Sequence, residues 1–115
     1  MSPAGGRRPE NAELRRLREE IDALDRRIVR LLNDRADLTV EVGHEKTRLG
    51  RRAIRDAQRE REVLLRVSIA NEGPLPQADL LAIYRRLIAS ARALEARERA
   101  RAAGRDDGEG EPPSA

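Results

Sequence analysis

The chain contains no cysteine, phenylalanine or tryptophan, and it has a single tyrosine, Tyr84, and a single histidine, His44. The absence of cysteine excludes a disulfide framework, a thiolate nucleophile and any cysteine-bound metal. One histidine excludes histidine-clustered metal sites and paired-histidine catalysis, and a Ser-His-Asp triad would have to use His44. Because large aromatic side chains are scarce, the core must consist of Leu, Ile, Val and Ala, which suits packing of helix against helix.

An excess of one charge is also lacking, since 24 basic and 21 acidic residues leave a formal net charge of +3. The two signs are interspersed, whereas helical nucleic-acid-binding proteins usually collect basic residues on one face. We interpret most charges as solvent-exposed helix faces and expect no nucleic-acid partner. No apolar run has the length of a membrane span and residues 1–13 have no signal-peptide core, which predicts a cytoplasmic protein without a membrane partner.

The 115 residues allow one domain, and we expect no second catalytic domain fused to it. No segment alternates apolar and polar residues as a strand does, so the predicted fold class is all-α. Residues 1–9 and 104–115, which are small, polar and glycine- and proline-containing, are predicted to be disordered. They flank a predicted helical domain of residues 10–103.

A long amphipathic helix is predicted over residues 13–48, with Gly50 as its stop and Gly43 inside it, where glycine either allows a close approach to the backbone or is tolerated. Its apolar residues recur at spacings of three and four. They are Leu14, Leu17, Ile21, Leu24, Ile28, Leu31, Leu38 and Val42. The helix is roughly 54 Å long, about twice the diameter of a compact domain of this size. The chain has too little material to cover this stripe, which predicts an intertwined homodimer.

Two shorter helices are predicted to follow, giving a three-helix subunit. Asp56 is a suitable N-cap for the first, which should end at Gly73, before Pro74. The second should begin near Gln77 or Asp79 and bury one apolar face. That face consists of Leu80, Ile83, Tyr84, Leu87, Ile88, Ala91 and Leu94.

Arg35 interrupts the apolar stripe of the long helix, between Leu31 and Leu38. A guanidinium stays charged when buried, so Arg35 either extends out of the stripe or faces an anion or a wet cavity. Lys46 follows eleven residues later and points within roughly 20° of Arg35. Two cations on one face, without a carboxylate between them, suit a dianion. Arg18 lies about 100° away and could join this site only from a partner subunit.

Further charged residues lie on faces that should be dry. Asp56, Arg59 and Glu60 share the first turn of the second helix and the edge of its apolar face, and Glu95 follows Ala91 by four residues on the third. Taken singly, these residues could be an N-cap with ordinary ion pairs and a solvated helix end. Together with the cations of the long helix, they predict one polar pocket rich in Arg and Lys inside a Leu/Ile bundle.

The strings LREEIDALDRRIVRLLNDR, LTVEVGHEK and IRDAQRERE, in this order and with consistent spacing, resemble chorismate mutases of the all-helical AroQ type, the type II fold. The resemblance runs from about Leu14 to Glu95. It implies a three-helix subunit with a very long first helix in an interlocked homodimer. It also implies an isomerase that rearranges chorismate to prephenate in phenylalanine and tyrosine biosynthesis, from the shikimate pathway, with no cofactor, metal or covalent intermediate.

The resemblance assigns roles to the cations of the long helix. Arg35 grips one carboxylate of chorismate, and Arg18 of the partner subunit grips the other. Lys46 contacts a carboxylate and the ether oxygen whose bond to the ring breaks. Such a site works by positioning and by preorganised charge, because the reaction is pericyclic.

The resemblance also implies that Glu60 accepts the ring hydroxyl, with Asp56 beside it, that Arg59 supports this end of the pocket, and that Val42 lines it. Two positions depart from the family pattern. The frequent Gln opposite the ether oxygen is Glu95 here, which must be protonated to donate a hydrogen bond. The Ser often found one turn earlier in the family is Ala91, so a carboxylate contact is missing or supplied differently.

Two other functions stay open from the sequence. Isochorismate-pyruvate lyase shares this fold and much of the pocket, although IRDAQRERE resembles the biosynthetic mutases more closely. A non-enzymatic helical dimerisation module would not explain an Arg in the apolar stripe. A noncovalent partner from the same pathway is compatible with either enzyme.

Overall fold

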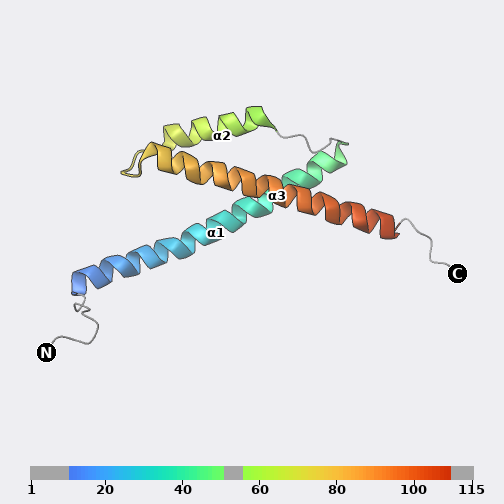
Figure 1. Ribbon diagram of the computed structural model, residues 1–115. Coiled ribbons are helices and arrows are strands. Elements are labelled where there is room, and N and C mark those ends of the chain that lie inside the picture. The colour runs from blue at the N-terminus through green and yellow to red at the C-terminus, as the bar shows by residue number, and fades with distance from the viewer. Residues whose placement is uncertain (1–10, 51–55, 110–115) are drawn as a thin grey trace, which may run out of the picture. The chain divides into compact units, whose positions relative to one another are not determined.

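The computed structural model describes residues 11–50 and 56–109, and this part of the chain forms three α-helices (Figure 1). They are α1 (Ala12–Arg48), α2 (Ala57–Ala70) and α3 (Gln77–Glu109). Because these residues contain no strand, the predicted all-α class with a long first helix is confirmed. The chain divides into two units, Met1–Arg35 and Ala36–Ala115, and α1 contributes to both.

An N-cap side chain marks the start of helix α1, and a glycine with a positive φ follows its end. At the start, Asn11 acts as N-cap, because its Oδ1 accepts a hydrogen bond from the Leu14 N–H at 2.7 Å. In the first turn, the hydrogen-bonded Arg16 guanidinium holds the pKa of Glu13 below its ordinary value. At the end, the predicted stop is confirmed: Gly50 has φ +71°, and its N–H donates to the Thr47 carbonyl at 3.0 Å.

In the unit Met1–Arg35, the apolar stripe of α1 is exposed to solvent. Its Leu and Ile side chains keep between 40% (Leu14) and 62% (Leu31) of their accessible surface. Isolated exposed apolar residues are normal on a protein surface, but a continuous stripe usually marks a contact with another molecule. The stripe is therefore an exposed apolar surface of the kind that contacts another molecule.

In the unit Ala36–Ala115, α2 packs alongside α3 (Figure 1). Ile88 on α3, at 9% exposure, is the buried hydrophobic residue of the described chain. The other predicted core residues of α3 are partly buried, with one exception. Ile83 is 51% exposed, so its predicted burial was wrong. It lies five residues from Ile88, about 140° around the helix, and α2 covers only one side of α3.

Helix α2 ends at Ala70, three residues before the stop predicted at Gly73. The reason is a network of side-chain hydrogen bonds that replaces the backbone hydrogen bonds of a further helical turn. Asn71 acts as C-cap, and its Nδ2 donates to Gln77 Oε1 at 2.8 Å. Gln77 Nε2 in turn donates to the Ser68 carbonyl at 3.1 Å. The Ser68 carbonyl also accepts the Asn71 N–H at 3.4 Å, so these bonds close the end of α2 and link it to the first residue of α3, Gln77.

Helix α3 continues to Glu109, so residues 104–109 are helical, although the sequence placed the start of a disordered tail at Gly104. Once a helix has formed, each further residue adds a backbone hydrogen bond and needs no tertiary contact. Gly104 and Arg105 are exposed, consistent with such an extension. The predictions of disorder for residues 1–9 and 110–115 concern segments outside the described residues. No helix in the described ranges is long and apolar enough to cross a bilayer.

The two glycines near the end of α1 should respond oppositely to alanine. Gly50→Ala should lower the free energy of unfolding by about 1 kcal/mol, because the positive φ disfavours a Cβ. Gly43→Ala should raise it by about 0.5–1 kcal/mol, because the helix interior favours Ala. A Cβ at Gly43 would lie 3.6 Å from Glu95 Cγ, an ordinary contact distance. Urea unfolding at fixed protein concentration measures both changes, and shifts of the same sign would contradict this account.

Candidate active site

Lys46 on α1 and Glu95 on α3 form an ion pair, with 3.6 Å between Lys46 Nζ and Glu95 Oε1. Both side chains are largely covered, at 24% and 18% exposure. The structure thus brings together two of the residues selected from the sequence, one from each of two helices far apart along the chain. Charges in such a partly dry setting interact more strongly with each other, and with a ligand, than they would in water.

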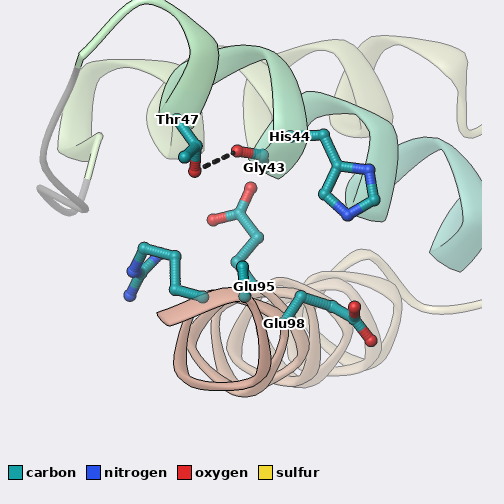
Figure 2. A pocket seen from close by; sticks show the side chains of 7 residues that line it. Gly43, His44, Thr47, Glu95 and Glu98 are labelled. Carbon is teal, nitrogen blue, oxygen red and sulfur yellow. Dashed lines mark hydrogen bonds between the residues drawn. The ribbon is translucent and has the colours of Figure 1, made fainter. Parts of the chain in front are cut away.

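Gly43 is buried at the place where the Glu95 side chain reaches α1 (Figure 2). The Glu95 side chain extends from α3 and ends beside Gly43 and Thr47, whose hydroxyl donates to the Gly43 carbonyl at 3.0 Å. Because a Cβ at Gly43 would lie at an ordinary contact distance of 3.6 Å from Glu95 Cγ, the approach does not require glycine, which agrees with the interpretation that Gly43 is tolerated in the helix. The contact places the Glu95 carboxylate next to the last turns of α1.

A small pocket opens beside this contact, with a volume of about 120 Å³. It is lined by Gly43, His44, Thr47, Glu95, Glu98, Arg99 and Ala102. Of these lining residues, Glu95 was predicted from the sequence as a site residue. Glu98, three residues further along α3, was not. Pockets that enclose a small organic ligand usually measure about 300–1,000 Å³. This pocket by itself is therefore too small for such a ligand.

Glu60 on α2 is held by Arg92 on α3, with 2.5 Å between Glu60 Oε1 and Arg92 Nη1. The Glu60 side chain is 15% exposed and the Arg92 side chain 39%. Glu60 was predicted from the sequence as a site residue, whereas Arg92 was not. Arg92 follows Ile88 by four residues and so lies on the packed side of α3, but this spacing alone does not distinguish a paired Arg from a solvated one.

Asp56 and Arg59 occupy the start of α2, as the sequence predicted. Asp56 is the N-cap, and its Oδ1 accepts a hydrogen bond from the Arg59 N–H at 2.9 Å. The Arg59 side chain is exposed and lies 3.9 Å from Glu62, a weak surface pair. Within the single chain, Asp56 therefore acts as an N-cap and Arg59 forms a surface ion pair, which were the alternatives to a role in the pocket.

The remaining site candidates lie on α1 and α3. Arg18, which is exposed, and Arg35, which is partly buried, lie on α1 in the unit Met1–Arg35. In the unit Ala36–Ala115, Val42 is 49% exposed and Ala91 is partly buried. Their roles in a common pocket stay predictions.

Comparison with known proteins shows the family to which this chain belongs. The model of the family "Chorismate mutase type II" matches residues 17–96. The bifunctional chorismate mutase/prephenate dehydratase of Aquifex aeolicus is 39% identical over 87 residues, which are 72% of this chain and 24% of that protein. The Escherichia coli K12 protein of the same name is 49% identical over 51 residues, which are 44% of this chain and 13% of that protein. The chain spans about a quarter or less of the length of these relatives.

A solved structure with the same fold aligns with this chain over most of the length of both chains. Chorismate mutase (Form II) from Thermus thermophilus superposes with a TM-score of 0.69 at 33% sequence identity. The match covers 74% of this chain and 96% of the Thermus chain. The family model, the curated relatives and the shared fold agree with the resemblance carried by the three strings of the sequence. The chain belongs to the chorismate mutase type II family.

Proposed function

We propose that the protein catalyses the rearrangement of chorismate to prephenate, an isomerase reaction of phenylalanine and tyrosine biosynthesis. The observation that carries the proposal is the Lys46–Glu95 pair between α1 and α3. It joins the two residues that the resemblance assigns to the breaking ether bond. The family match over residues 17–96 contains both residues. The Thermus chorismate mutase supports the proposal further, because this chain aligns with almost all of it.

The proposed chemistry needs charge placed correctly and no covalent step. As the ether bond breaks, negative charge develops on its oxygen, and the Lys46 ammonium stabilises that charge more than it stabilises the ground state. A guanidinium binds a carboxylate through two parallel hydrogen bonds, so Arg35 holds one carboxylate of the substrate in a fixed direction. Arg35 and Lys46 are eleven residues apart in the sequence, a spacing at which an α-helix returns to nearly the same side.

We further propose that the active form is a homodimer whose partner subunit supplies Arg18. Two features of the chain support this. The apolar stripe of α1 is exposed from Leu14 to Leu31. The pocket beside Glu95 has a volume of about 120 Å³, less than an enclosed organic ligand requires. A second copy of α1 would cover the stripe and could add walls and a cation to the pocket.

The relatives from Aquifex aeolicus and Escherichia coli carry the names of two activities, mutase and prephenate dehydratase. The region that matches this chain is the smaller part of each. A noncovalent partner that uses prephenate is therefore compatible with the proposed function and would be a separate polypeptide or segment.

The first prediction concerns the reaction and Arg35 together. Purified wild-type protein should consume chorismate and form prephenate, and Arg35→Ala should lower kcat/KM by about 100-fold or more, because a charged carboxylate contact is lost. Arg30→Ala is the matched control, since Arg30 is exposed and lies about 140° around α1 from Arg35. Product analysis decides the reaction. Pyruvate release from isochorismate without chorismate turnover would favour the lyase, and inertness toward both would favour a non-enzymatic module.

The second prediction tests the shared site. Arg18→Ala and Arg35→Ala should each be nearly inactive, but an equal mixture after subunit exchange should recover about a quarter of wild-type activity, because half of the dimers are hybrids with one intact site. Arg18→Ala mixed with the Arg18→Ala/Arg35→Ala double variant is the control and should stay inactive. A mixture no more active than its components, in a confirmed hybrid dimer, would contradict a site shared between subunits.

The third prediction concerns Glu95. Only a protonated Glu95 can donate a hydrogen bond to the ether oxygen, so kcat/KM should rise as the pH falls. Glu95→Gln carries a permanent donor and should remove that rise. Profiles of kcat/KM from about pH 5 to 9 for both proteins measure the effect. An activity that falls on acidification, with Glu95→Gln indistinguishable from wild type, would rule out this role.

A further inference from the structure

We propose that Arg92 is a positioning residue of this site, which holds the Glu60 carboxylate in the direction needed to accept the substrate's ring hydroxyl. The inference rests on the proposed function and extends it to a residue that had no assigned part in the reaction. It is carried by the contact between Arg92 Nη1 and Glu60 Oε1, at 2.5 Å, which joins α3 to α2.

The contact is less exposed to solvent than the surface ion pairs, because the Glu60 side chain keeps 15% of its accessible surface. A covered carboxylate needs a charged or hydrogen-bonding partner, since burial removes its water. The pairs Arg16–Glu13 and Arg59–Glu62 have both members at about half exposure, where solvent weakens the attraction. The Arg92–Glu60 pair, in contrast, joins two helices and combines a short distance with a covered carboxylate.

The position of Arg92 on α3 connects the two parts of the proposed site. Arg92 follows Ile88 by four residues, so its aliphatic stem continues the packed side of α3. It precedes Glu95 by three residues, so it lies about one turn from the Lys46–Glu95 pair on the same helix. Helix α3 thus carries both the residue proposed to face the ether bond and the residue that holds the hydroxyl acceptor.

Arg92 would assist the reaction in two ways. A glutamate side chain has several rotatable bonds, and a fixed guanidinium selects one of its orientations before substrate arrives, so less order must be imposed on binding. The substrate is a dianion, and a bare Glu60 carboxylate near it would repel it. The Arg92 charge offsets that repulsion across the pocket. Both effects act through Glu60 and require no contact between Arg92 and the substrate.

The experiment compares Arg92→Gln, Arg92→Lys and the matched control Arg85→Gln in steady-state turnover of chorismate by the full chain. Arg85 is exposed and lies two turns earlier on the same side of α3. Arg92→Gln should lower kcat/KM about tenfold, with kcat as well as KM affected, because orientation is lost. Arg92→Lys keeps the charge and should recover most of the loss, and Arg85→Gln should match wild type. Circular dichroism and thermal unfolding of each variant identify any that fail to fold.

A double-mutant cycle with Glu60→Gln separates an action through Glu60 from a direct role of Arg92, and thermal unfolding of the same variants shows whether the loss of activity is instead a loss of structure. If Arg92 acts through Glu60, adding Arg92→Gln to Glu60→Gln should change kcat/KM by less than about twofold. Full additivity of the two losses, or a folded Arg92→Gln with wild-type kcat and KM, would overturn the role of Arg92 while leaving the mutase activity standing. A wild-type protein that does not convert chorismate would overturn the proposed function and this role with it.

Discussion

The apolar stripe of α1 is the constraint on which the rest of the structure depends. Six Leu and Ile side chains from Leu14 to Leu31 stay at least 40% exposed, although their spacing of three and four is the signature of a packed helix face. A helix of 37 residues is far longer than α2, the helix that packs on α3. In the proposed homodimer, α1 would supply this stripe as the contact surface for the second subunit.

The candidate site uses the same helices differently, through charges at the edges of their packed faces. Lys46 meets Glu95 where the Glu95 side chain reaches α1 beside buried Gly43, and Glu60 meets Arg92 at the side of α3 that carries Ile88. Neither contact supplies a nucleophile. Both fix charged groups in partly dry positions, which is what a reaction controlled by positioning and electrostatics requires.

Local chemistry explains which features could be predicted from the sequence. The period of the apolar residues determined the helices, and Gly50 and Asp56 marked their ends because a positive φ and an N-cap are properties of single residues. The early end of α2 depended on a network through Gln77, and the exposure of Ile83 depended on which side α2 covers. Arg92 was missed because an Arg beside a packed face resembles a solvated one until its partner on another helix is known.

Ile88 is the buried hydrophobic residue of the described chain, and so small a core affects how the subunit folds. A subunit with so small an interior gains little free energy by folding alone. If a second copy covers α1, folding and association become one equilibrium, and the apparent stability rises with the concentration of chains. The midpoint of thermal unfolding would then depend on the protein concentration as well as on the sequence. Dilution alone would favour unfolding.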